Sequence, residues 1–149
     1  MVQPSDYLIT IRYISKLYDH MLKPICEEYQ LTLIEANIIS FLYHNPQKDT
    51  AREIVELRLL SKGNVSQAIE ALIQKSLLKR YQDTKDRRKI HLSLLPKAKA
   101  ITEAIEAVGQ KFHQTIFQDI SLEEQILLFQ LNQTMKKNAE IVLQRGNLL

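Results

Sequence analysis

The chain has little cysteine, glycine or proline, and no long apolar run. Its 149 residues include one cysteine, three glycines and four prolines. A single cysteine excludes an internal disulfide and a thiolate zinc site. So few glycines and prolines exclude a low-complexity chain. No apolar run approaches the ~20 residues that a membrane-spanning helix needs. The first residues lack the basic start and apolar stretch of a signal peptide, so we expect a cytoplasmic protein.

The residue patterns of enzymes and metal sites are also missing. The sequence contains no glycine loop that would cradle a phosphate, and no convincing nucleophile with its base. No two of the four histidines lie three to five residues apart, the spacing typical of metal ligands. They are His20, His44, His91 and His113. We therefore interpret them as isolated surface or core residues, and we expect no enzyme, no metal and no cofactor.

What the chain does have is enough apolar sequence for one core and an uneven distribution of charge. Hydrophobic residues make up 45% of a chain of one-domain length. The segment from Lys75 to Lys99 contains nine basic and two acidic residues, a net charge of +7, so the remainder carries −4 of the total +3. A cationic region on an acidic body can orient a protein toward phosphate. By itself this cluster favours DNA only modestly over an ordinary solvated surface.

Long amphipathic helices are predicted at both ends of the chain. Apolar residues recur at steps of three and four from about residue 5 to 28, with Pro24 placed to kink or stop that helix. The same spacing predicts a helix over about 96–118 and a last helix opened by the capping box that begins at Ser121. These helices have more apolar surface than one small core can cover. We therefore expect the first helix and the last two to interlock with those of a second copy, as a homodimer.

A small lobe with a helix-turn-helix is predicted between them. Capping boxes at Thr32 and Thr50 open two helices, the second short, with Leu57 among its inward residues. Ser61 can cap a third helix, from Lys62 to about Lys75, at the spacing of a helix-turn-helix. Two strands follow, over 77–81 and 90–94, and the second alternates apolar and polar residues from Ile90 onward.

The helix that begins at Lys62 and the loop between the strands carry the chemistry. The outward face of this helix is small and polar near its start, where amides such as those of Asn64 and Gln67 can pair with adenine. The hairpin tip is basic, and a carboxylate such as Asp86 can hold the guanidinium of Arg88 in a fixed direction for a narrow minor groove. The residues that we expect to contact DNA are Thr50, Ser61, Lys62, Gly63, Asn64, Ser66, Gln67, Lys85, Asp86, Arg87, Arg88 and Lys89. Polar helix faces and charged turns are common, so only their occurrence together favours DNA clearly.

With these residues in view, the chain resembles the MarR family of transcriptional regulators from about Ile9 to Val142. The most specific segments are Ser61–Leu72, Leu78-Lys79-Arg80, and Asp83 with Asp86-Arg87-Arg88. The resemblance implies a homodimer on a palindromic operator, usually as a repressor, with Arg88 in the minor groove and Asp86 steadying it. The chain departs from the family pattern at five positions. They are Gln67 and Ala71, where basic residues are frequent, Ser76 and Ala98, where glycine is usual, and Leu95, where threonine is usual.

The resemblance also implies a small effector. The family often binds phenolic or aromatic acids in a crevice between its dimer base and its DNA-binding lobe. Tyr13, Tyr18, His20 and Tyr43 are candidates to line such a crevice, although aromatic residues at helical spacing more often belong to a core or an interface. Some relatives sense oxidants through a cysteine in the first helix. The acidic neighbours of Cys26 would raise its pKa, which favours an inert cysteine.

The combined prediction is a mainly α (α+β) winged helix-turn-helix protein with long N- and C-terminal dimerisation helices. We expect one regulator domain over 1–149, with dimerisation helices at about 5–29 and 96–145 and a DNA-binding lobe at about 32–95. Its expected partners are double-stranded DNA, a second copy and possible small aromatic or phenolic effectors, with no membrane. The main alternative is a winged-helix adaptor that uses its basic hairpin on an acidic protein partner.

Overall fold

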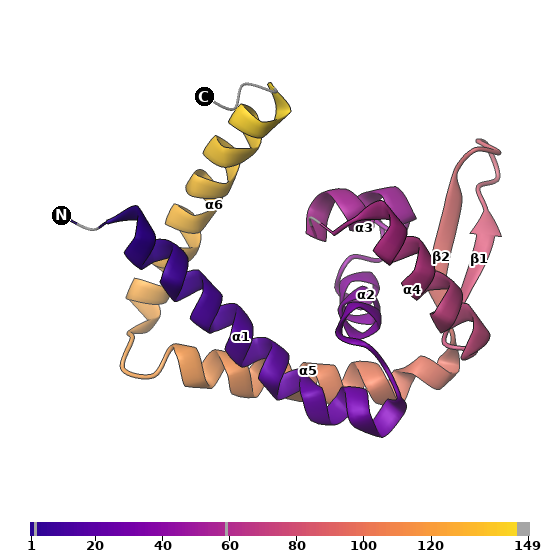
Figure 1. The fold of residues 1–149 in the computed structure, drawn as a ribbon, viewed down its shortest axis with the longest axis horizontal. Helices are drawn as coiled ribbons and strands as arrows, with labels where there is room; N and C mark the ends of the chain where they lie inside the picture. Colours follow the sequence, from indigo (N-terminus) through magenta and orange to yellow (C-terminus); the bar gives the residue numbers. More distant parts are fainter. Residues whose placement is uncertain (2, 59, 146–149) are drawn as a thin grey trace. The chain divides into compact units, whose positions relative to one another are not determined.

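The computed structural model describes residues 1, 3–58 and 60–145 of the chain. It divides into two compact units, Met1–Phe112 and His113–Leu149. The elements in chain order are α1 (Pro4–Tyr29), α2 (Leu33–His44), α3 (Ala51–Arg58), α4 (Lys62–Gln74), β1 (Leu78–Gln82), β2 (Ile90–Leu94), the 3-10 turn η1 (Pro96–Ala98), α5 (Lys99–Ile116) and α6 (Leu122–Gln144) (Figure 1). The strands form one antiparallel pair. The predicted mainly α (α+β) winged helix-turn-helix fold is confirmed.

Side-chain caps fix where the helices begin, as the sequence predicts. Thr32 caps α2 and Ser121 caps α6, each in a complete capping box with a glutamate three residues on. At α3 the hydroxyl of Thr50 accepts the N–H of Glu53 at 3.2 Å. At α4 the hydroxyl of Ser61 accepts the N–H of Asn64 at 3.2 Å. Each bond satisfies an amide that has no partner within its own helix.

The core of the first unit is formed by one face of each of the helices α1 to α5 and by the two strands. The fully buried side chains include Leu22 of α1, Ile38 and Ile39 of α2, Ile54 of α3 and Leu72 of α4. Strands β1 and β2 contribute Leu78 and Leu92, and the start of α5 contributes Ile101 and Ile105 to the same cluster. The predicted inward face of α4 is largely confirmed, because Val65, Ala68, Ile69 and Leu72 are buried.

Two predictions of burial were wrong, and two predicted helix bounds need correction. Pro24 lies inside α1 and does not stop it; α1 continues to Tyr29 and is capped by Gln30, which adopts a left-handed backbone. Leu57 is exposed, because α3 is short and buries only Ile54. Ile90 is also exposed, since the first residue of β2 adjoins the polar loop rather than the core. The predicted helix over 96–118 is divided into η1 and α5.

The end of α4 is a turn that positions β1. Ser76 has a φ of 61°. Its N–H donates to the carbonyl of Ile73, and the N–H of Leu77 donates to that of Leu72, both at 3.0 Å. This pair of bonds is the Schellman motif, in which glycine is the usual residue at the left-handed position. Arg80 of β1 then forms an ion pair with Glu70 of α4, so the strand and the helix are held together.

Both units carry apolar side chains that their own unit leaves exposed. In the first half of α1, Leu8, Ile9, Ile11 and Ile14 are exposed. Helix α6 has no buried residue over its 23 positions. Its exposed apolar side chains include Leu122, Ile126, Leu127, Phe129 and Leu131. Exposed apolar surface of this extent is typical of an interaction site. No helix of the described residues is long and apolar enough to cross a membrane.

Candidate nucleic-acid interface

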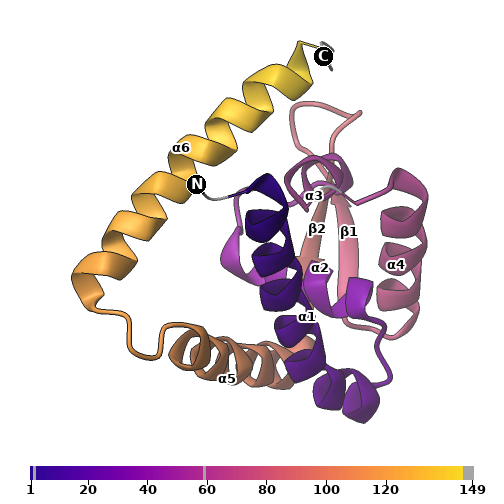
Figure 2. The same ribbon diagram turned by 60° about the vertical axis from the view of Figure 1, so that its left-hand side comes forward.

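The exposed side chains at the start of α4 are polar, and several of them are small. The exposed residues at this end are Lys62, Gly63, Asn64, Ser66 and Gln67, while the buried face of the helix consists of Val65, Ala68, Ile69 and Leu72. Ser61 is occupied as the cap of the helix. Figures 1 and 2 both show the start of α4 and the loop between β1 and β2 at the same end of the lobe. The predicted helix residues are therefore exposed at the same end of the lobe as the hairpin tip.

Gly63 is not required by the packing of the chain itself. A Cβ atom at this position would meet no other atom within 4 Å. Glycine weakens a helix relative to alanine by about 1 kcal/mol. A glycine that costs helix stability and relieves no contact within the chain is consistent with a position where a partner approaches closely.

Main-chain hydrogen bonds hold the hairpin loop, which we call the wing (residues 83–89), in a defined turn. The N–H of Asp83 donates to the carbonyl of Lys89 at 2.9 Å. The Oδ2 atom of Asp83 accepts the N–H groups of Lys85 at 2.9 Å and Asp86 at 2.8 Å. Gln82 adds a side-chain bond to the carbonyl of Arg87 at 2.9 Å. Aspartate commonly stabilises turns in this way, and the result is a tip whose backbone is ordered.

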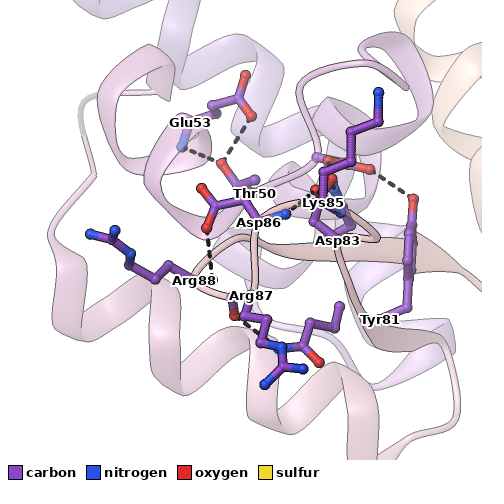
Figure 3. Close-up of polar contacts among 11 residues, drawn as sticks. Thr50, Glu53, Tyr81, Asp83, Lys85, Asp86, Arg87 and Arg88 are labelled. Atoms are coloured by element: carbon purple, nitrogen blue, oxygen red, sulfur yellow. Dashed lines mark hydrogen bonds and ion pairs between the residues drawn. The ribbon is translucent and has the colours of Figure 1, made fainter.

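Asp86 steadies Arg88 by a route that differs from the prediction. Its Oδ1 atom accepts the main-chain N–H of Arg88 at 3.0 Å, rather than a bond from the guanidinium. Figure 3 shows the side chain of Arg88 extending away from the turn. The physical reason is local: two residues along a turn, the nearest donor to an aspartate is the backbone amide. The carboxylate therefore fixes the point from which the arginine projects.

The cationic groups of the wing have no acidic partner among the described residues. Lys85, Arg87, Arg88 and Lys89 are exposed, and none of them takes part in an ion pair found in the described part of the chain. Their charges are therefore available to phosphate oxygens or to base edges.

The first turns of α3 link the wing to α4. A hollow of about 730 Å³ is lined by Thr50–Glu53 and Glu56 on one side and by Asp86 and Arg88–Ile90 on the other. A second hollow of about 350 Å³ lies between α3 and the start of α4, against Lys62 and Ser66. Ala51, Arg52 and Glu56 line both hollows. Thr50 lines the first hollow, but its hydroxyl is hydrogen-bonded to Glu53. Its role is therefore to cap the start of α3.

At the base of the wing, His91 of β2 bridges two carboxylates. Its Nδ1 atom lies 2.5 Å from Asp49 Oδ1, and its Nε2 atom lies 2.7 Å from Asp83 Oδ1. Tyr81 of β1 stacks on the imidazole and donates its hydroxyl to Asp49 at 3.2 Å. The bond to His91 and the wing amides lower the pKa of Asp83 to about 2. The same carboxylate, followed by Asp49, raises the pKa of His91.

Sequence reasoning missed this cluster and Arg52, a basic residue in the first turn of α3. His91 was interpreted as an isolated histidine, because its partner Asp49 lies 42 residues away in sequence. The available signal was the position of Asp83 and His91 at the two ends of one hairpin. Arg52 was missed because it stands inside the capping box; its side chain is exposed and pairs with Glu56 at 3.0 Å.

One of the four residues that were proposed to line an effector crevice lies at a hollow. Tyr18 lies against Phe112, with ring centroids 5.0 Å apart, and lines a hollow of about 380 Å³. The other lining residues are Ile14, Ser15, Asp19, Asn37, Arg58 and Phe112. Tyr13, His20 and Tyr43 are exposed and do not line it.

Cys26 is buried in the core. Burial raises the pKa of its thiol, and the carboxylates of Glu35, Asp19 and Glu27 raise it further. A protonated, buried thiol is a poor nucleophile. Among the described residues, no group of three His, Cys, Asp or Glu side chains could hold a metal ion.

Comparison with known proteins gives a family for this fold and this surface. Residues 29–89, which contain the helix-turn-helix and the wing, match the model of the MarR family. This match supports the resemblance to the MarR family that the sequence indicates. No curated protein matches it. Members of this family regulate transcription rather than catalyse reactions, so the expectation of a protein that is not an enzyme is confirmed.

Solved structures of MarR proteins have the same fold at low sequence identity. A MarR protein from Peptoclostridium difficile superposes with a TM-score of 0.82 at 20% identity, over 98% of this chain and 95% of that one. A MarR transcriptional regulator from Methanosarcina mazei Go1 gives 0.75 at 17% identity, over 92% and 99%. BpsR of Bordetella bronchiseptica, whose DNA binding is regulated by 6-hydroxynicotinic acid, gives 0.68 at 20% identity, over 88% and 98%.

Proposed function

We propose that this protein is a ligand-responsive repressor of the MarR family that binds a palindromic operator as a homodimer. The observation that supports the DNA contact most strongly is a set of wing cations that form no ion pair with any described residue, at the same end of the lobe as the polar start of α4. In this proposal Lys62, Gly63, Asn64, Ser66 and Gln67 enter a major groove. Arg88 enters the adjacent minor groove, and the remaining wing cations contact phosphates.

The proposal of a homodimer is supported by the apolar faces that each unit leaves exposed. The first half of α1 and the whole of α6 carry exposed leucine, isoleucine and phenylalanine side chains. A second copy would cover both faces with the same residues that it presents, which is the symmetry of most soluble dimers. Two copies would also set two copies of α4 about one helical turn of DNA apart, as a palindrome requires.

The proposal of an effector is supported by the hollow at Tyr18. The wall contains two aromatic rings, Tyr18 and Phe112, and a cation, Arg58. Arg58 donates to Asn37 at 2.7 Å, which links the end of α3 to α2. An aromatic acid would stack on the rings and pair with the guanidinium. Because Arg58 belongs to α3, its capture by a ligand would act on the helix that lies between the wing and α4.

The decisive experiment is a selection of genomic DNA fragments by the purified protein, followed by sedimentation of the free and DNA-bound forms. The proposal predicts recovery of fragments that share an inverted repeat, and a complex that contains two chains. Binding should weaken steeply as salt rises, because cations on the protein release the counterions of phosphate.

An adaptor for an acidic protein would give a different result. It would select no shared sequence from genomic fragments, and the Arg88→Ala variant would bind random DNA as the parent does. The effector arm is tested by titrating a hydroxylated aromatic acid into the complex. Release by the parent protein but not by the Arg58→Ala variant supports the hollow at Tyr18 as the site.

A further inference from the structure

We propose that His91 and Asp49 are positioning residues for the DNA contact, and that the doubly protonated imidazole of His91 clamps the wing to the loop that precedes α3. The proposal rests on the proposed function, in which the wing contacts DNA. It concerns residues outside the DNA-facing surface, and it makes the proton on His91 a determinant of affinity.

The geometry places one imidazole between two separate parts of the lobe. Asp49 belongs to the loop between α2 and α3, while Asp83 is the first residue of the wing. Both carboxylates are within hydrogen-bonding distance of the ring, at 2.5 Å and 2.7 Å. The side chains are mostly shielded, with 16% of His91, 12% of Asp49 and 24% of Asp83 exposed. Shielding from water strengthens such bonds.

The two bonds require two protons on the ring. An ionised carboxylate only accepts hydrogen bonds, so both ring nitrogens must donate. An imidazolium has two N–H groups, whereas a neutral imidazole has one and presents a lone pair at the other nitrogen. Loss of the second proton therefore leaves a lone pair facing a carboxylate oxygen, and one of the two carboxylates is released.

The backbone indicates which side moves when the clamp opens. The N–H of Leu92 donates to the carbonyl of Asp49 at 2.8 Å, so β2 stays joined to the loop before α3 whatever the state of the ring. Asp83 holds the amides of Lys85 and Asp86 through its other oxygen. A change at its bond to His91 is therefore transmitted to the turn that presents Arg88.

The charged groups that raise the pKa of His91 are Asp83 and Asp49. Tyr81 stacks on the ring from β1, and the pKa of its hydroxyl is raised by burial and by Asp49, which keeps it neutral and able to donate. Helices α2 and α3 also pack against β2. Their titratable side chains are occupied elsewhere: Glu35 with Lys75, His44 with Glu106, Tyr43 against the His44 ring, Arg52 with Glu56, Glu53 with Thr50, and Arg58 with Asn37.

The direction of the pH effect follows from the partners of the ring. Asp83 and then Asp49 raise the pKa of His91 above its ordinary value. The clamp is therefore closed below that raised pKa and opens as pH rises through it. DNA affinity should fall about three- to tenfold on the alkaline side of the His91 titration, the effect of losing about one hydrogen bond.

The first arm of the test measures the clamp without DNA. Nitrogen-15 NMR of the full-length protein would follow the ring of His91 and the amides of residues 83–89 between about pH 5.5 and 9. The proposal predicts that His91 titrates above the ordinary histidine range and that the wing amides shift with the same midpoint. In the Asp49→Asn variant the midpoint should fall. Wing amides that stay fixed while His91 titrates would overturn the clamp.

The second arm measures affinity against pH at constant ionic strength, for a labelled fragment from the genomic selection and a random-sequence duplex. His91→Gln should bind with little dependence on pH in this range, near the level of the alkaline parent. The matched control is His113→Gln, which removes a histidine of α5 and should keep the pH profile of the parent. An unchanged profile in His91→Gln would overturn the positioning role. Absence of binding to either duplex at any pH would instead contradict the proposed function and the positioning role with it, while the amide shifts would still show whether the clamp exists.

Discussion

The carboxylate of Asp86 accepts the main-chain N–H of Arg88, with 3.0 Å between Oδ1 and N. This bond fixes the backbone at the base of the arginine, and the guanidinium forms no ion pair with any of the described residues. A guanidinium tied to a carboxylate would have to break that pair to contact DNA. Here the tip is ordered and the charge is available at the same time.

Two substitutions of Asp86 separate the effect of its hydrogen bond to the Arg88 amide from the effect of its negative charge. Asparagine keeps an oxygen that accepts the amide of Arg88 and removes a negative charge, so Asp86→Asn should bind DNA as tightly as the parent or more tightly. Asp86→Ala loses the bond and should weaken binding about three- to tenfold, the value of one hydrogen bond of about 0.5–1.5 kcal/mol. Fluorescence anisotropy with a selected duplex measures both. Equal losses in the two variants would mean that the carboxylate acts through its charge.

Arg88→Ala should weaken DNA binding by about 1–3 kcal/mol and reduce the slope of affinity against salt by about one. The cause is the loss of a cation that forms no ion pair with the described residues, at the tip of the wing. The control is Lys23→Ala, which removes an equal charge from an exposed position of α1 and should leave binding close to that of the parent. Sedimentation should show the same dimer for both variants. Undiminished affinity in Arg88→Ala would count against the wing as a DNA contact.

Gly63→Ala should have opposite effects on stability and on binding. The added Cβ meets nothing within 4 Å, so the variant should gain up to about 1 kcal/mol of helix stability. The same methyl group should weaken DNA binding where the start of α4 approaches a groove wall. Gly109→Ala in α5 is the control, since its Cβ also meets nothing within 4 Å. Thermal unfolding and anisotropy compare the two. DNA affinity unchanged in Gly63→Ala would place the groove contact elsewhere.

Ser76→Gly should stabilise the protein by about 0.5–1 kcal/mol. Ser76 has a φ of 61°, and an L-residue in this region costs roughly 1–2 kcal/mol, part of which is offset by the greater freedom of glycine in the unfolded chain. Urea unfolding of the two proteins measures the difference. DNA affinity should stay the same because the turn keeps its two backbone bonds. A loss of stability would show that the serine side chain makes a compensating contact.

Asp83→Asn should lose stability in a manner that depends on pH. The pKa of Asp83 is lowered from 3.8 to about 2. A lowered carboxyl pKa gives stability that is present above the unfolded value and is lost as pH falls toward the folded one. The difference between parent and variant should therefore be full at neutral pH and vanish as pH approaches about 2. Unfolding monitored by circular dichroism across this range tests it. If the stability difference between parent and variant did not change with pH, the ionisation of Asp83 would not contribute to stability.

Local sequence patterns predicted the elements of the fold well. The caps at Thr32, Ser61 and Ser121 were located correctly because a cap needs only a side chain and the amides two or three residues on. The strand over 90–94 was placed at its observed bounds. The errors at Leu57 and Ile90 concerned burial. Whether a residue near the end of a short element is buried depends on which other elements pack over that end.

The sequence by itself determined the kind of surface: a glycine-bearing polar helix start, a hairpin rich in lysine and arginine, and helices at both ends with apolar stripes. These properties follow from residue spacing and charge, and both can be obtained from the sequence without coordinates. Only the tertiary structure decided how the wing is held. It places Asp49 beside His91, although 42 residues separate them in sequence, and it places Asp83 at the other ring nitrogen. It also shows that the Asp86 carboxylate accepts the backbone N–H of Arg88. The reason is that hydrogen bonds depend on distances within a few tenths of an ångström, and strand pairing and loop packing set those distances.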